Sequence, residues 1–206
     1  LIVGKTIKSV HFDTPKSFPN DPQEVTTFVI GAAVSDVRRR AKVLLIELSS
    51  GYTFVTHLKM TGQLVFRGDE AFGAGHPSDS LIVELPDRST RVTLMFTDDS
   101  KLFFNDQRKF GWMKLVATPL VASLEFFQKV GPEPLGNDFT ADVLFARLQR
   151  RKNTSIKAAL LDQTVLAGVG NIYADESLWG AQIHPSTRVK DVLKDDVARL
   201  HSELIR

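Results

Sequence analysis

The sequence contains no cysteine, which excludes disulfides, thiolate nucleophiles and cysteine-ligated metal sites within its 206 residues. It also lacks an apolar run of the roughly 18 residues that cross a bilayer, so we expect no membrane partner. The first residues, LIVGKTIKSV, carry neither an initiator Met nor the regions of a signal peptide. These absences predict a cytoplasmic protein and indicate that the chain has been cut.

A large excess of one charge is absent as well. Lys and Arg total 26 against 24 Asp and Glu, so the formal net charge is only +2. A protein that holds a polyanion through bulk charge has a much larger excess, and any nucleic-acid binding must therefore rest on local clusters. Each cluster is also compatible with an ordinary solvated surface. The basic clusters are VRRRAK (37–42), QRK (107–109) and RLQRRKNTSIK (147–157).

The first half of the sequence has the pattern of an antiparallel β structure. Short apolar segments separated by turn residues predict strands and hairpins. Asp21 and Pro22 predict a helix over residues 22–30 as its N-cap and first residue, and the polar stretch 68–80 predicts a mobile loop. The expected strands are KTIKSVHF, AKVLLIEL, YTFVTHL, GQLVFRG, DSLIVEL, RVTLMFT, KLFFND and WMKLV.

From residue 119 the apolar residues recur at helical spacing. Thr140 and Thr154 each precede such a run and predict two helix starts, and the last helix should carry an apolar stripe. The stripe consists of Leu193, Val197, Leu200 and Leu204. We therefore predict an α+β chain with a β-sandwich domain at 1–118 and a helical domain at 119–206.

The segment LAGVGNIYADESLW places two glycines directly before a predicted helix. Gly168 and Gly170 allow close backbone approach, and the N–H groups at a helix start bind anions such as a phosphodiester. Asn171 would add a side-chain donor. The same glycines are also typical of a tight corner between helices, so the pattern alone leaves both interpretations open.

Two further segments have residues suited to entering a base stack. In FFNDQRKFGW, Arg108 and Phe110 on a turn would replace an extruded base, although a buried Phe110 and an Arg108–Asp106 ion pair fit the spacing equally. In HLKMTG, Met60 would act as a flexible apolar wedge and His57 as a phosphate donor. The alternative is that HLKMTG simply ends a core strand.

Five segments in order closely resemble formamidopyrimidine-DNA glycosylases and the related endonuclease VIII group, along the whole chain: VRRRAKVLLIEL, HLKMTG, NDQRKFGWM, GPEPL and SIKAALLDQTVLAGVGNIYADESLW. The resemblance implies an N-terminal β-sandwich followed by a helix-two-turn-helix DNA-binding domain. It implies base excision repair of duplex DNA that contains oxidised bases, such as formamidopyrimidine and 8-oxoguanine, or abasic sites. Such enzymes flip out the base, excise it, and nick the strand by β,δ-elimination. A monomer in the bacterial cytosol or nucleoid is expected.

The resemblance also implies roles for individual residues of the first half. Lys42 matches an accessory catalytic lysine that contacts the substrate near the damaged nucleotide. His57 matches a phosphate-binding histidine. Met60, Arg108 and Phe110 match the three side chains that fill the space left by the flipped base.

In the second half, Asn171 matches a phosphate-binding asparagine and Lys157 a lysine near the lesion or backbone. Members of the family begin with Pro-Glu, whose proline is the nucleophile and whose glutamate protonates the sugar. They end in a zinc finger with four cysteines. Neither segment occurs between Leu1 and Arg206, so we expect no metal ligand in this chain, zinc in the finger of a longer parent, and no activity of this segment alone.

Two alternatives remain at this point. One is a damaged-DNA-binding module of the same fold that does not cleave. The other is an RNA-binding protein that uses a helix-two-turn-helix, although the NDQRKFG segment counts against it. The preference between oxidised purines and pyrimidines is not resolved by the sequence, although GPEPL and NDQRKFG favour the formamidopyrimidine subgroup.

Overall fold

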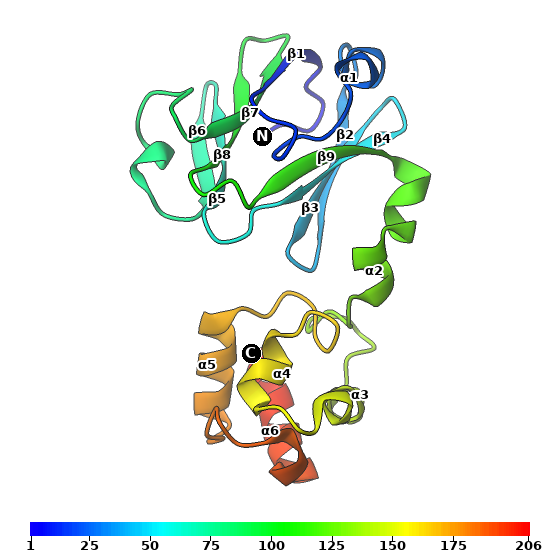
Figure 1. Cartoon of the computed structure of the whole chain (residues 1–206), viewed down its shortest axis with the longest axis vertical. Helices are drawn as coiled ribbons and strands as arrows, with labels where there is room; N and C mark the ends of the chain where they lie inside the picture. Colours follow the sequence, from blue (N-terminus) through cyan, green and yellow to red (C-terminus); the bar gives the residue numbers. More distant parts are fainter. The chain divides into compact units, whose positions relative to one another are not determined.

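A computed structural model describes residues 1–206 and divides them into two compact units, Leu1–Ser123 and Leu124–Arg206. Figure 1 shows strands throughout the first unit and helices in the second. Each unit has its own hydrophobic core. The two units are therefore described separately.

The first unit contains two antiparallel sheets. The five-stranded sheet has the order β1 (Ile7–Phe12), β7 (Thr90–Phe96), β8 (Lys101–Asp106), β5 (Gly62–Arg67) and β6 (Ala71–Gly75). The four-stranded sheet has the order β2 (Val34–Arg40), β3 (Val43–Leu48), β4 (Tyr52–His57) and β9 (Trp112–Ala117). One buried cluster takes side chains from both sheets, among them Phe66 and Phe104 from one and Ile46 and Phe54 from the other. The sheets therefore pack face to face, as expected for a sandwich.

The helix in the first unit forms for the local reasons that the sequence indicates. Helix α1 (Pro22–Phe28) begins at Pro22, and the Asp21 side chain accepts a hydrogen bond of 2.7 Å from the backbone N–H of Gln23. The cap satisfies one of the donors that a helix start leaves unpaired. The predicted helix is confirmed, and it ends two residues earlier than expected.

Two expectations for residues 68–85 are wrong. Residues 71–75 form β6, which pairs with β5, although all five residues are exposed and therefore show no alternating pattern. A Cβ on Gly75 would lie 2.3 Å from the carbonyl oxygen of Gly62, so this strand needs glycine to approach its neighbour. The segment DSLIVEL forms a 3-10 turn, η1 (Asp79–Leu81), and its Ile82 and Val83 are exposed instead of buried in a strand.

The second unit is built from short helices around its own apolar cluster. They are α2 (Glu125–Lys129), α3 (Ala141–Leu148), α4 (Ile156–Leu161), α5 (Asn171–Gly180) and α6 (Lys194–Ile205). The second unit also contains two 3-10 turns, η3 (Gln149–Arg151) and η4 (Val189–Asp191). A further 3-10 turn, η2 (Thr118–Ser123), ends the first unit. None of the helices combines the length and apolar character needed to cross a lipid bilayer.

The caps and stripe of the second unit follow the prediction only in part. Thr140 caps α3 by accepting from the N–H of Val143. The cap of α4 is Ser155 and not Thr154, whose hydroxyl instead donates to the carbonyl of Arg151. On α6, Val197 and Leu200 are buried, whereas Leu193 is exposed because it is the N-cap.

Candidate nucleic-acid interface

Two loops that join the sheets lie side by side at one end of the first unit. Residues 58–61 connect β4 to β5, and residues 107–111 connect β8 to β9. Since β4 pairs with β9 and β5 pairs with β8, both ends of one loop are held next to the ends of the other. The pairs that flank the loops are His57↔Trp112 and Gly62↔Asp106. We call these two segments the crossover loops.

The carboxylate of Asp106 ties the crossover loops together. Asp106 is fully buried, and it accepts hydrogen bonds from the hydroxyl of Thr61 in one loop and from backbone N–H groups in the other. The N–H of Arg108 donates at 3.2 Å and that of Gly111 at 2.6 Å. Hydrogen bonds to an ionised acceptor are the stronger kind, so one side chain fixes the shape of both loops.

The crossover loops present large side chains to solvent. Met60 is 67% exposed and Phe110 is 52% exposed. The Arg108 guanidinium lies 5.0 Å from the centre of the Phe110 ring, and the Lys16 ammonium lies 5.1 Å from it. Phe110 is therefore not a core residue, and Asp106 binds the backbone of Arg108 through its carboxylate. An exposed ring with two cations beside it is suited to stacking against a base close to phosphates.

Lys42 and His57 lie at the same end of the four-stranded sheet. Lys42 follows Ala41 in the turn between β2 and β3, and the next residue, Val43, pairs with His57. The Nδ1 atom of His57 accepts from the backbone N–H of Lys59 at 3.0 Å, which places the ring proton on Nε2.

Burial and two nearby positive charges favour the neutral form of His57. Burial, followed by the positive charges of Lys59 and Lys42, lowers the pKa of His57 to about 4. Burial also lowers the pKa of Lys42. A neutral imidazole that donates through Nε2, beside an ammonium group, is a suitable pair for an anionic oxygen.

In the second unit, Gln163 shapes the loop that leads into α5. Its side-chain oxygen accepts from the N–H of Gly168 at 2.9 Å, and its amide nitrogen donates to the carbonyls of Leu161 and Val169. Gly168 has a φ of +79°, which glycine adopts without strain. Gly170 is the N-cap of α5, so no side chain caps the first turn, and exposed Asn171 is its first residue. This helix start has the donors of an anion site.

The GPEPL segment packs against the same loop. The N–H of Gly131 donates to the carbonyl of Gln163 at 2.8 Å, and the N–H of Ala167 donates to that of Pro132 at 2.9 Å. A Cβ on Gly131 would lie 2.6 Å from the carbonyl oxygen of Val165. This segment therefore supports the loop before Asn171 and requires glycine for its close approach.

Lys157 of α4 reaches the face of α5 that begins with Asn171. Its ammonium forms an ion pair with Asp175 at 2.8 Å. Asp175 lies four residues after Asn171, and residues four apart share one face of a helix. Lys157 therefore lies along this face with its charge partly offset by an acid.

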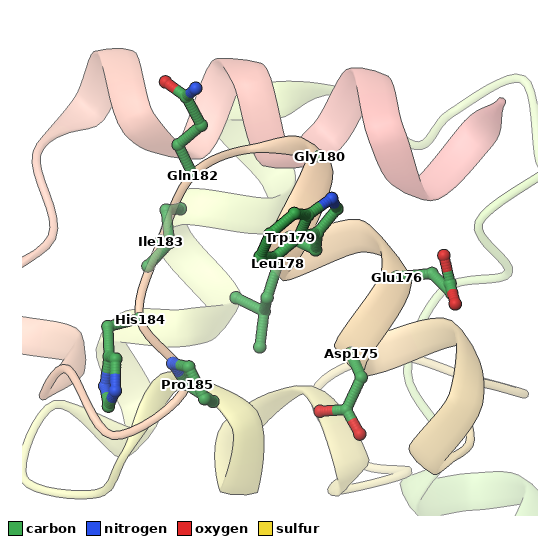
Figure 2. Close-up of a pocket in the computed structure, with 9 residues that line it drawn as sticks. All are labelled: Asp175, Glu176, Leu178, Trp179, Gly180, Gln182, Ile183, His184 and Pro185. Atoms are coloured by element: carbon green, nitrogen blue, oxygen red, sulfur yellow. The ribbon is translucent and has the colours of Figure 1, made fainter.

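A hollow of about 1020 Å³ lies further along α5. Figure 2 shows Trp179, which is 84% exposed, near the centre of its lining, with Asp175 and Glu176 on the preceding turn. The lining contains two acids and neither Lys nor Arg. The lining therefore offers a phosphate no Lys or Arg partner, unlike the start of the helix.

Comparisons with known proteins agree on one family. Family models match residues 1–113 as the formamidopyrimidine-DNA glycosylase N-terminal domain and residues 130–206 as its H2TH domain. The formamidopyrimidine-DNA glycosylase of Lactobacillus helveticus is 37% identical over 204 residues, which cover 99% of this chain and 69% of that protein. The chain belongs to the formamidopyrimidine-DNA glycosylase family.

Other members of the formamidopyrimidine-DNA glycosylase family support the same assignment. The Herpetosiphon aurantiacus protein is 43% identical over 181 residues, which cover 88% of this chain and 60% of that protein. The Lactococcus lactis enzyme, solved non-covalently bound to DNA with an abasic (AP) site, superposes with a TM-score of 0.84 at 29% identity. That match covers 99% of this chain and 73% of the other. The predicted α+β fold with a helix-two-turn-helix domain is confirmed, and the chain spans 60% to 73% of these relatives.

The residues that the resemblance singled out form one group in each unit. The first unit brings Lys42, His57, Met60, Arg108 and Phe110 to the end where the crossover loops lie. The second unit brings Lys157 and Asn171 to one face of α5. Their roles in a formamidopyrimidine-DNA glycosylase stay predictions.

The sequence did not reveal the residues that position these groups. Asp106 was considered only as an ion-pair partner of Arg108, and the polar residue ahead of the RKFG turn was the available signal for a cap. Gln163 carried no signal, because its bonds depend on the path of the folded loop. No three His, Asp or Glu side chains of residues 1–206 are grouped so that they could hold a metal ion.

Replacing Asp106 with Asn should loosen both crossover loops. Both carboxylate oxygens of Asp106 accept hydrogen bonds, and in Asn one of them is replaced by an NH₂ group that cannot accept. At least one hydrogen bond is therefore lost, which should lower the free energy of unfolding by about 1–3 kcal/mol. Urea unfolding should show this loss, and amide exchange should accelerate at Arg108 and Gly111. Asp99→Asn removes the same charge at the exposed surface and should leave both measurements unchanged. Equal effects of the two variants would contradict the role of Asp106.

His57 should stay neutral across the physiological range. Because its pKa in the folded chain lies below the ordinary value, protonation should begin only as the pH approaches about 4. An NMR titration of the imidazole resonances, assigned with His57→Gln, measures this directly. A midpoint near 6.5 would show that the ring is solvated and that Lys42 and Lys59 do not act on it.

Proposed function

We propose that this chain supplies the DNA-binding and base-extruding part of a DNA glycosylase/AP lyase of base excision repair. Its substrate class is duplex DNA with oxidised bases, such as formamidopyrimidine and 8-oxoguanine, or with abasic sites. The observation that carries the proposal is the pair of crossover loops, which present Met60, Arg108 and Phe110 from a frame fixed by one buried carboxylate. Membership of the formamidopyrimidine-DNA glycosylase family supplies the reaction class.

Base extrusion explains why these three side chains are exposed. Moving a base out of the duplex costs a few kcal/mol of stacking and pairing. Phe110 and Met60 offer apolar surface to the bases that lose a neighbour, and Arg108 offers donors to the base that loses its partner. The Asp106 hydrogen bonds hold the loops before DNA arrives, so less ordering remains to be done on binding.

Phosphate binding follows from the remaining groups. In the first unit, the Lys42 ammonium and the Nε2–H of His57 would contact the backbone near the flipped nucleotide. In the second unit, the first N–H groups of α5 and the Asn171 amide would hold another phosphate. Lys157 would add a cation beside it, with Asp175 as its partner when DNA is absent.

The bond-breaking groups are a separate part of the proposal. The proline nucleophile and the glutamate acid of the family have no counterpart among residues 1–206, and we do not transfer the nucleophile's role to Lys42. Both groups, and the zinc finger, would belong to a longer protein of the length of the relatives. Borohydride trapping of that longer protein on an abasic duplex should give a covalent adduct. Absence of an adduct would favour a damaged-DNA-binding module that does not cleave.

Asn171→Ala should weaken binding to every duplex by a similar factor. Loss of one hydrogen bond to a charged oxygen corresponds to about 1.5–3 kcal/mol, or roughly tenfold to a hundredfold in Kd. Fluorescence anisotropy with several duplex sequences, at low and high salt, measures the change. Asn137→Ala, an exposed asparagine of the same unit, is the matched control. Unchanged affinity for Asn171→Ala would contradict the phosphate contact.

Phe110→Ala should impair extrusion of a damaged base more than binding of an abasic site. An abasic site has no base to unstack, so only the damaged duplex should lose the ring's stacking, on the order of tenfold. Fluorescence of 2-aminopurine beside the lesion reports extrusion, and anisotropy reports Kd on both duplexes. Phe72→Ala removes a ring of similar exposure, 56%, from β6 and should have no effect. Equal losses on both duplexes would show that Phe110 does not act in extrusion.

A further inference from the structure

Two segments of the second unit bring together cations that the proposed function does not use. Residues 152–156 and 187–190 run antiparallel and are joined by backbone hydrogen bonds. The N–H of Lys190 donates to the carbonyl of Lys152 at 3.0 Å, and the N–H of Ile156 donates to that of Thr187 at 2.8 Å. An isolated bridge pairs Ser155 with Arg188.

Packing turns the charged side chains of these segments outward. Ile156 and Val189 are buried in the core, whereas Arg188 and Lys190, on either side of Val189, are exposed. Lys152 lies opposite Lys190, and Arg150 precedes it in η3, which packs against η4. We call Arg150, Lys152, Arg188 and Lys190 the basic ridge.

The basic ridge keeps its positive charge. None of its four side chains forms an ion pair within residues 1–206, whereas neighbouring Arg151 pairs with Asp162 at 2.7 Å and Lys157 pairs with Asp175. Asp191 is the acid next to the ridge in the sequence, and one carboxylate against four cations leaves a clear positive excess. Cations gathered on one face repel each other, and a polyanion relieves that repulsion.

We propose that the basic ridge is a second phosphate-binding surface, which contacts the backbone of the same duplex that binds at the start of α5. The inference rests on the proposed function, because it adds a contact to the same DNA. From Lys157, beside α5, to Lys152 the chain spans five residues, which reach at most about 17 Å. At about 3.4 Å per nucleotide along one strand, Lys152 falls within roughly five nucleotides of a phosphate held beside Lys157.

The side chains of the ridge fit a DNA backbone better than a lipid surface. Apart from half-buried Pro185, residues 150–155 and 184–191 expose polar or charged side chains, because Val189 points inward. Membrane-surface binding needs apolar side chains that enter the acyl boundary. Contacts to phosphates need only cations and polar donors, and they carry no sequence information. The ridge should therefore strengthen binding to damaged and undamaged duplexes alike.

The salt dependence of binding by the 206-residue chain tests this inference. Lys152→Ala/Lys190→Ala should make the plot of log K against log salt shallower by about 1.8, since each lost phosphate contact removes about 0.9 from the slope. The affinity for an undamaged duplex of roughly 20 base pairs should fall on the order of tenfold at about 100 mM salt. Lys152→Arg/Lys190→Arg should keep the slope of the unmodified chain.

Lys129→Ala/Lys194→Ala is the matched control, because it removes the same charge from lysines paired with Glu125 and Asp142. A slope change equal to that of the control would overturn the ridge as a contact surface while leaving the proposed function intact. An unmodified chain that binds no duplex at any salt concentration would overturn the proposed function and the ridge with it. Thermal unfolding should be the same for all variants, since the substituted side chains are exposed.

Discussion

The hydrogen bonds of the Asp106 carboxylate are the constraint on which the candidate interface depends. A chain that leaves one sheet and later returns must cross between the sheets twice, and here the two crossings are adjacent because their flanking strands are paired. Such loops have buried backbone donors with no sheet partner. The Asp106 carboxylate accepts from two backbone N–H groups of one loop and from the Thr61 hydroxyl of the other, and so offsets the penalty for these donors. With the backbone fixed, large side chains such as Met60 and Phe110 can face water without packing support of their own.

The second unit uses a neutral side chain for the same purpose. Gln163 both donates and accepts within the loop that leads to α5, and the backbone of the GPEPL segment holds that loop from the other side. The start of α5 is thereby positioned without a capping side chain, and its first N–H groups remain available for an anion. In each unit, the hydrogen bonds of one polar side chain, buried Asp106 or partly buried Gln163, fix the loop that carries the exposed candidate residues.

Helix caps and strands that depend on residues close in the sequence could be predicted. Hydrogen bonds between residues that only the tertiary fold brings together could not. The Asp21 and Thr140 caps and most strands follow from local pattern. The strand β6 was missed because it is exposed on both faces and rich in glycine, and residues 79–85 were misassigned because their apolar side chains look like those of a strand. The exposed residues Met60, Arg108 and Phe110 could be singled out because they lie in segments that resemble those of the family. The roles of Asp106 and Gln163 could not be predicted, because most of their hydrogen bonds run to backbone atoms that only the fold brings near.

The small net charge conceals an uneven distribution of paired and unpaired cations in the folded chain. The three basic clusters of the sequence meet different surroundings once the chain folds: Arg38 faces Glu47 across a strand pair, and Arg151 faces Asp162. Paired cations of this kind contribute little to a distant anion, because the acid cancels their field within about a Debye length. Other cations form no ion pair, among them Lys42 and Lys59 near His57, Arg108 and Lys109 in the crossover loops, and the four side chains of the basic ridge. At Lys42 and Lys59 the positive charge acts on the protein itself, since it helps to keep His57 neutral and hence a donor through Nε2 alone. A formal charge of +2 therefore does not describe the local charge of the surface, because folding decides which of the 26 basic side chains are offset by acids and which are not.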